Sequence, residues 1–113
     1  MSSNTSDSPK LYTYLCLLPD FAEGSKRMSV RPQHRANAKK HREEGSLINS
    51  GATFSEDISK STDGVGKMDG TWMLIRAESL EKAREFVSDD VYATGGAWDL
   101  SKATIRSIAY AQQ

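Results

Sequence analysis

The chain has 113 residues, a hydrophobic fraction of 37%, and 15 basic against 15 acidic residues, so its formal net charge is zero. This length fits one domain with a modest core. The balanced charge argues against a protein whose whole surface attracts nucleic acid or anionic lipid. Cys16 is the only cysteine, which excludes an intrachain disulfide and a cysteine-based zinc site.

The sequence contains no long apolar run and no charged-then-apolar segment at its start, so we expect a cytoplasmic protein with no membrane partner. The first ten residues, MSSNTSDSPK, have no apolar residue after Met1 and predict a disordered tail over 1–10. Residues 11–113 are then one domain. The mean hydropathy of −0.59 is low, which also fits a sheet face that is completed by a second subunit.

The expected elements alternate between apolar strands and amphipathic helices. Pro19 closes the first strand, and Ser29 and Ser79 are placed to cap the two helices. Gly45 suits the left-handed position that follows a helix, and Gly51 predicts a weakened or bulged strand. In chain order we expect strand 11–18, helix 30–44, strand 46–54, loop 55–70, strand 71–77, a helix from 80, an irregular link over 89–97 and strand 98–110.

This βαββαβ order predicts an α+β fold. With right-handed crossovers it gives an antiparallel sheet with both helices on one face, the ferredoxin-like sandwich. The chain directions then bring three segments to one edge of the sheet, namely 19–34, 55–70 and 88–97. We expect any pocket to be built from these three segments.

Two histidines, His34 and His41, share the helix face that carries Val30 and Ala38. Only His34 is near the predicted pocket edge. Both can equally be partly buried side chains with satisfied hydrogen bonds. Their spacing of seven differs from the three or four that helical metal ligands use, so we expect no metal.

Asp89, Asp90 and Tyr92 follow the second helix and should reach the same edge as His34. A carboxylate bonded to one imidazole nitrogen fixes the tautomer and leaves the other nitrogen free to move a proton. The plain alternative is that both acids belong to a solvated helix end and turn. Two adjacent acids at the negative end of a helix are electrostatically unfavourable, which favours a local reason for one of them.

The segment RMSVRPQHRANAKKHREEGSLINSGATFSED, followed by DDVY and a closing strand, resembles the YCII-related domain over about residues 11–110. The resemblance implies a ferredoxin-like fold that pairs as a dimeric α+β barrel. It also implies that His34 and Asp90 are a catalytic pair, and that lyase or dehydrohalogenase-type chemistry on hydroxylated rings is the best precedent. The usual Asp-Pro-Tyr reads Asp90-Val91-Tyr92, and the usual Gly-Pro reads Gly51-Ala52. The remaining pieces that carry the resemblance are Arg31-Pro32-x-His34 and Glu44-Gly45-x-Leu47.

Residues 26–42 hold seven Lys or Arg residues and no acid. Arg31, and with it Arg27, can steer an anionic or phenolate substrate to the pocket edge. The other basic residues of the helix are expected to form its solvated outer face. These are Arg35, Lys39, Lys40 and Arg42.

The leading hypothesis is an enzyme that needs no cofactor and moves protons on a hydroxyaromatic or enolisable metabolite. His34 is the base or acid, Asp90 orients it, Arg31 stabilises an enolate and Tyr92 donates a hydrogen bond. Elimination, isomerisation and ring closure all fit this set, which suits a secondary-metabolic lyase, isomerase or cyclase. The alternative is a dimeric ligand-binding or accessory domain without turnover. RNA binding is not expected, because TWMLIRA lacks the aromatic signature of RNA-binding sheets.

Overall fold

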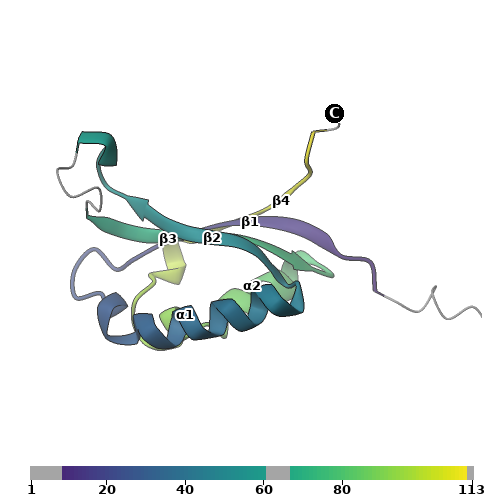
Figure 1. Cartoon of the computed structure of the whole chain (residues 1–113), viewed down its shortest axis with the longest axis horizontal. Coiled ribbons are helices and arrows are strands. Elements are labelled where there is room, and N and C mark those ends of the chain that lie inside the picture. The colour runs from purple at the N-terminus through teal and green to yellow at the C-terminus, as the bar shows by residue number, and fades with distance from the viewer. Residues whose placement is uncertain (1–8, 61–66, 112–113) are drawn as a thin grey trace, which may run out of the picture.

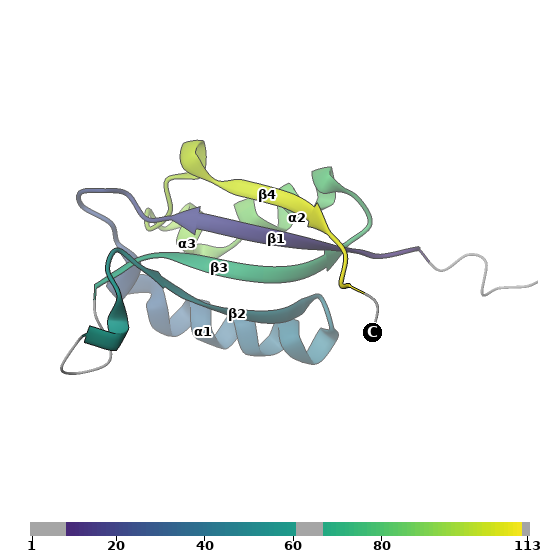
Figure 2. The same cartoon turned by 90° about the horizontal axis from the view of Figure 1, so that it is seen from above.

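The computed structural model describes residues 9–60 and 67–111. The expected tail over 1–10 and the middle of the expected loop over 55–70 therefore lie largely outside the described residues. Four strands form one antiparallel sheet in the order β2-β3-β1-β4. Figure 1 shows helices α1 and α2 together beneath one face of the sheet, and Figure 2 shows the strand order from the opposite side. The expected ferredoxin-like sandwich is confirmed.

The elements are β1 (Tyr12–Pro19), α1 (Arg27–Glu44), β2 (Leu47–Phe54), η2 (Ile58–Lys60), β3 (Met68–Ala77), α2 (Leu80–Ser88), α3 (Val91–Thr94), η3 (Leu100–Lys102) and β4 (Thr104–Ile108). None of the helices in the described ranges combines the length and the apolar composition that a membrane crossing requires.

Alternation along the strands builds the core between the sheet and the helices. In β1 the side chains of Tyr14, Cys16 and Leu18 are buried on the helix-covered face, while Leu17 lies on the other face and is 42% exposed. β3 alternates in the same way, with Met73 and its neighbours two residues away buried. Among the described elements, no α-helix packs on the second face of the sheet (Figure 1).

Helix α1 begins at Arg27, three residues earlier than expected, and Ser29 does not cap it. A hydroxyl two residues before Arg27 and one tertiary contact take the place of a side-chain N-cap. The Ser25 hydroxyl accepts a hydrogen bond from the Arg27 amide (3.3 Å), and the Lys26 amide donates to the Gly96 carbonyl (3.0 Å). The expected left-handed glycine is confirmed, since Gly45 has φ 89°. The expected Ser79 cap of α2 is also confirmed, by a bond from the Lys82 amide (3.1 Å).

Other boundaries were wrong. The register irregularities of β2 fall between Leu47 and Asn49 and between Thr53 and Phe54, not at Gly51. β3 begins at residue 68 rather than 71, because the end of β2 pairs with it. The expected link over 89–97 contains the short helix α3, and the expected strand over 98–110 is reduced to β4. Trp98 forms only a single bridge to Asp20, since its indole fills the core instead of continuing a strand.

Candidate active site

The imidazole of His34 meets the carboxylate of Asp90 at the pocket edge. His34 Nδ1 and Asp90 Oδ1 are 2.8 Å apart, and the side chains are only 10% and 9% exposed. An ionised carboxylate can only accept, so Nδ1 carries the proton in this pair. Nε2 then has the free lone pair. The expected meeting of these two residues is confirmed, while their catalytic role stays a prediction.

Asp90 is also held in place by a second hydrogen bond, as the cap of a short helix. This explains why an acid stands at position 90, directly after Asp89. It is the N-cap of α3, and its Oδ1 also accepts from the Tyr92 amide at 2.9 Å. Val91 takes the first helical position, a position that also suits proline. The cap holds the turn without the proline ring. Asp89, in contrast, ends α2 and is exposed.

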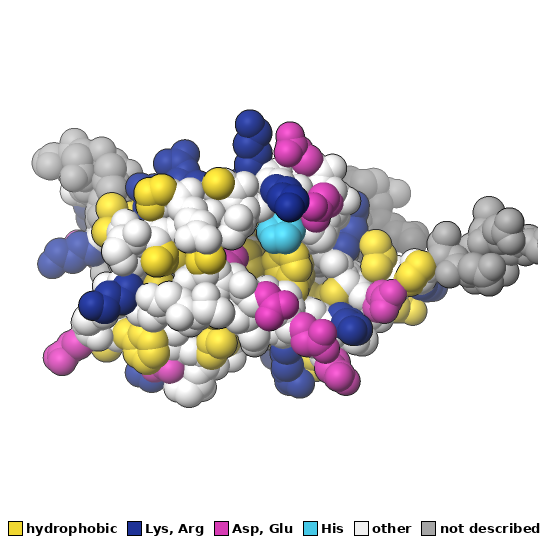
Figure 3. Space-filling model, turned by 90° about the horizontal axis from the view of Figure 1, so that it is seen from below, with side chains coloured by type: hydrophobic (Ala, Val, Ile, Leu, Met, Phe, Trp, Pro, Cys, Tyr) yellow, Lys and Arg dark blue, Asp and Glu magenta, His cyan; other side chains and the backbone are white. Residues whose placement is uncertain are grey.

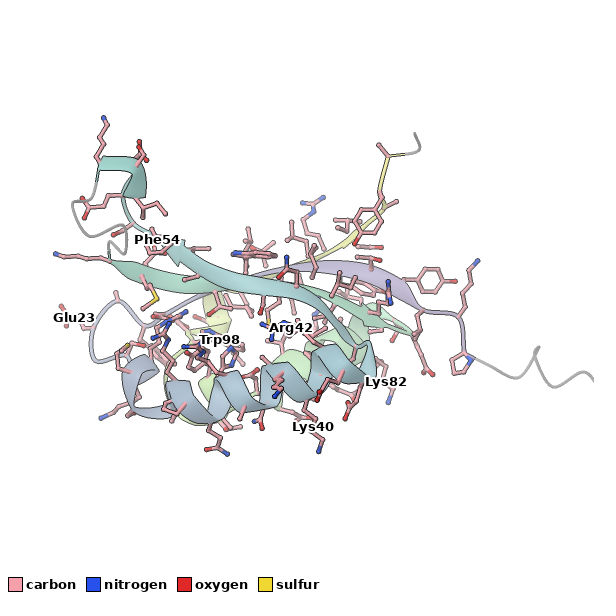
Figure 4. All side chains as sticks on the ribbon, in the orientation of Figure 1. Glu23, Lys40, Arg42, Phe54, Lys82 and Trp98 are labelled. Atoms are coloured by element: carbon pink, nitrogen blue, oxygen red, sulfur yellow. The ribbon has the colours of Figure 1, made fainter. Side chains whose placement is uncertain are left out.

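Aromatic rings hold the imidazole in place. The ring of Tyr92 stacks on His34 with centroids 3.7 Å apart and planes at 11°. Trp98 contacts both rings edge-on, at 6.0 Å from His34 and 5.4 Å from Tyr92. Figure 4 shows Trp98 between α1 and the sheet. Tyr92 is 1% exposed, so its main structural role is to support His34, and its expected bond to substrate stays a prediction.

Beneath this stack lies a buried polar network centred on Arg27. Its Nη1 donates to Asp20 Oδ1 and to Thr71 Oγ1, each at 3.0 Å. Thr71 Oγ1 also accepts from Trp98 Nε1 at 3.1 Å. The guanidinium carbon lies 5.0 Å from the centre of the Tyr92 ring, within the range of a cation–π contact. The network thus ties the first turn of α1 to the ring that supports His34.

Burial shifts the pKa values of two groups in this part of the site, Asp20 and Tyr92. Burial raises the pKa of the Asp20 carboxyl, and the opposing pull of the Arg27 charge does not cancel it. Burial also raises the pKa of the Tyr92 phenol, and the Arg27 and Arg31 charges only reduce that effect. Burial therefore disfavours the charged forms of Asp20 and Tyr92. Tyr92 stays a neutral phenol at physiological pH.

A cleft of about 590 Å³ opens between α1 and the β2 side of the sheet. His34 and Tyr92 line it at one end, and Ser50, Ala52 and Met68 line it on the sheet side. Five basic residues also line it: Arg27, Arg31, Arg35, Lys39 and Arg42. Arg35, Lys39 and Arg42 are exposed, as expected of a solvated helix face, and they also line the cleft between α1 and β2. Figure 3 shows the helix-covered face, on which basic and acidic side chains are interspersed.

The second histidine is not part of the site. His41 is half-buried, its ring packs against Phe86 with centroids 4.8 Å apart, and its Nδ1 lies 3.5 Å from Glu44 Oε2. Within residues 9–60 and 67–111, no three His, Cys, Asp or Glu side chains gather as metal ligands would.

Sequence reasoning missed Asp20, Thr71 and Trp98. Asp20 directly follows the first strand and Trp98 directly follows the expected link, so both stood in or beside segments already assigned to the pocket edge. Thr71 follows the expected loop in the same way. Their role escaped notice because a buried threonine or tryptophan has no sequence pattern that separates it from ordinary core.

The architecture is a ferredoxin-like α+β sandwich with a histidine–carboxylate pair at the rim of the sheet. The YCII-related domain model matches residues 12–102. The chain belongs to the YCII-related domain family.

Three curated fungal relatives are similar over 97 residues, which is 85% of this chain. Aspartate kinase FUB3 of Fusarium oxysporum f. sp. lycopersici is 31% identical, but the chain spans only 18% of that protein. Fusaric acid biosynthesis protein 2 is 28% identical in Gibberella fujikuroi and 27% identical in Gibberella moniliformis, with 91% of each covered. The two latter relatives are proteins of small-molecule biosynthesis.

Among solved structures, the chain is similar to 5-chloro-2-hydroxyhydroquinone dehydrochlorinase (TftG) from Burkholderia phenoliruptrix AC1100, in complex with 2,5-dihydroxybenzoquinone. The TM-score is 0.61 at 19% identity, with 88% of this chain and 95% of that chain covered. At this identity the similarity establishes the fold.

Proposed function

We propose that this protein is a small-molecule enzyme that transfers protons without a cofactor, of the lyase, isomerase or cyclase type. Its substrate is a hydroxyaromatic or enolisable metabolite. The observation that carries the proposal is the 2.8 Å contact between His34 Nδ1 and Asp90 Oδ1 in the wall of a cleft of small-molecule size.

His34 acts through Nε2. This nitrogen takes a proton from a carbon beside a carbonyl, and the electron pair of that C–H bond moves into an enolate. The imidazolium that forms is stabilised by Asp90, which is buried beside it. Arg31, with Arg27, stabilises the enolate oxygen. His34 then returns the proton to another atom of the substrate, or to a group that leaves.

The relatives support this class of chemistry. The dehydrochlorinase named above acts on a chlorinated, hydroxylated ring, and loss of HCl from such a ring requires removal of a proton and departure of chloride. The fungal biosynthesis proteins support a place in secondary metabolism. We carry both to this chain as part of the proposal.

A solvent-exchange experiment tests the proposal. 2-Oxobutyrate is incubated with the full chain in D₂O, and loss of the proton signal at its third carbon is followed by NMR. A parallel reaction with 5-chloro-2-hydroxyhydroquinone is followed by chloride release. We expect catalysis of one of these reactions, with His34→Gln reducing its rate by about 10²–10⁴-fold.

His41→Gln is the matched control, because it removes the other imidazole of α1 and should leave the rate unchanged. A rate that is equal in His34→Gln and the native chain would contradict the assignment. Binding of these probes without exchange or chloride release would instead support the non-catalytic, ligand-binding alternative.

We also propose that the protein is a homodimer. The uncovered sheet face presents partly exposed apolar side chains on β1 and β3, and Leu17 is 42% exposed. Such a face favours association. Light scattering should show a dimer at micromolar concentration, and Leu17→Glu should shift it toward monomer. A native chain that stays monomeric there contradicts the proposal.

The cytoplasm is the compartment we propose, since the lone Cys16 thiol stays reduced there. Nucleic acid is not among the proposed partners, and a gel shift at physiological salt tests that exclusion.

A further inference from the structure

The wall that α1 contributes to the cleft holds more positive charge than the proton-transfer pair uses. Arg31, Arg35, Lys39 and Arg42 follow one another at intervals of four, four and three residues, which places them on one flank of the helix. Among the described residues that line the cleft, none is Asp or Glu. The flank therefore faces a space that no carboxylate of the cleft wall neutralises.

No ion pair among the described residues accounts for these four positive charges. The ion pairs found within residues 9–60 and 67–111 involve none of these four side chains. Like charges three and four residues apart destabilise a helix. Repulsion along this flank therefore lowers the stability of the unliganded protein, and an anion bound in the cleft would offset that loss.

Arg27 gives an independent indication of a ligand at the His34 end. Its side chain is 9% exposed, and its Nε is buried without a hydrogen-bond partner. A buried N–H group that lacks an acceptor is unfavourable, and such groups are usually satisfied by a ligand or water. Arg27 also lines the cleft, so its guanidinium belongs to the wall that an anion there would meet.

The basic flank is longer than one anionic group requires. Eight residues of α-helix separate His34 from Arg42, a rise of about 12 Å. Across the cleft stand Ser50, Ala52 and Met68, which carry no charge. Figure 4 shows Arg42 between α1 and the sheet, whereas Lys40 projects from the opposite side of the helix.

We infer that the cleft binds a substrate with two anionic ends. One end, the carboxylate or enolate beside the reacting carbon, binds Arg27 and Arg31. The other end is a remote carboxylate or phosphate that binds Arg35, Lys39 and Arg42. The inference rests on the proposed function for the position of the reacting carbon, but the second anion subsite is a binding property that can be tested by itself.

Calorimetric titration with matched probes tests the inference. The probes are 2-oxopentanoate, the diacid 2-oxoglutarate of the same chain length, its longer homologue 2-oxoadipate, and the phosphonate 2-oxo-4-phosphonobutanoate. We expect the best doubly anionic probe to bind at least about tenfold more tightly than the monoacid, which is what one additional charge-assisted hydrogen bond gives. This preference should shrink as salt is added. Comparison of the carboxylate and the phosphonate shows which remote group the cleft prefers.

The variant Lys39→Gln/Arg42→Gln should lose the preference and keep its affinity for 2-oxopentanoate. Lys40→Gln is the matched control, since it removes an exposed lysine of the same helix that does not line the cleft and should keep the preference. Equal binding of the monoacid and every doubly anionic probe would overturn the inference. A preference that persists in the double variant would also overturn it.

The two proposals fail separately. His34→Gln should abolish solvent exchange and leave the preference for doubly anionic probes intact. Exchange that depends on His34, without any such preference, refutes the second subsite alone. The preference without exchange by the native chain refutes the catalytic proposal and leaves the subsite standing.

Discussion

Substitution of Asp90 tests the site most directly, because one of its carboxylate oxygens accepts two hydrogen bonds with different roles. It accepts from His34 Nδ1 at 2.8 Å and from the Tyr92 amide at 2.9 Å, as the cap of α3. In Asp90→Ala, loss of the cap costs about 1 kcal/mol. The imidazole N–H left buried without an acceptor costs about 1–3 kcal/mol more. We therefore expect the free energy of unfolding to fall by roughly 2–4 kcal/mol.

Asp90→Asn separates the capping role of Asp90 from the effect of its negative charge on His34. Asparagine caps helices as well as aspartate, and its amide oxygen can still accept from the imidazole. The stability loss should therefore be about 1 kcal/mol or less, while loss of the negative charge behind the imidazolium should lower the rate of proton transfer by about 10²-fold or more. Asp89→Asn is the control, because Asp89 is exposed and substitution there should change stability by no more than about 0.5 kcal/mol.

Urea unfolding followed by tryptophan fluorescence measures the stabilities, and an unchanged m-value shows that the compactness of the two states is unaltered. Long-range ¹H–¹⁵N correlation spectra report the tautomer of His34 directly. The native chain should show the proton on Nδ1, and Asp90→Ala should lose that preference. Retention of the Nδ1 tautomer in Asp90→Ala, together with a stability loss below about 1 kcal/mol, would refute this account of the pair.

Three further predictions follow from the described contacts. Gly95→Ala should lose about 1–3 kcal/mol of stability in urea unfolding, because a Cβ there would stand 2.6 Å from the Val91 carbonyl oxygen and 3.0 Å from Val30 Cγ1; native-like stability would contradict this packing. Burial raises the pKa of the Cys16 thiol to about 12, so a disulfide reagent at mildly alkaline pH should label the unfolded but not the native chain. The raised pKa of Tyr92 means that native Tyr92 keeps its proton above the ordinary value of about 10, where the unfolded chain loses it. Stability should thus fall as pH rises through that window, and less so in Tyr92→Phe, with the tyrosinate absorbance difference between the two chains as the check.

The sequence predicts the fold well, because hydrophobic periodicity and caps are local signals. Ser79 and Gly45 mark helix ends by their own chemistry, and both have the expected role. The start of α1 was missed because carbonyl groups of residues 96 and 97, distant in sequence, fix Lys26 and Ser25 just before the helix. The last strand was overextended because Trp98, a residue typical of strands, is used to fill the core instead.

The meeting of His34 and Asp90 was predictable because chain direction alone brings the start of α1 and the end of α2 to one edge. The basic flank was not. Six basic residues in one helix are ordinarily explained as its solvated face, and only the packing of α1 against β2 decides which of them also line a cleft. Arg35 and Lys40 look alike in the sequence and differ in the structure, where only Arg35 lines the cleft.

The arrangement of charge explains why the two acids near the site lie where they do. Neither Asp20 nor Asp90 lines the cleft. Either carboxylate in the cleft wall would neutralise the basic flank and weaken the binding of an anion. Asp20 instead pairs with the buried Arg27 at 3.0 Å. Asp90 acts on the cleft only through the imidazole of His34, so its negative charge supports proton abstraction without repelling the substrate.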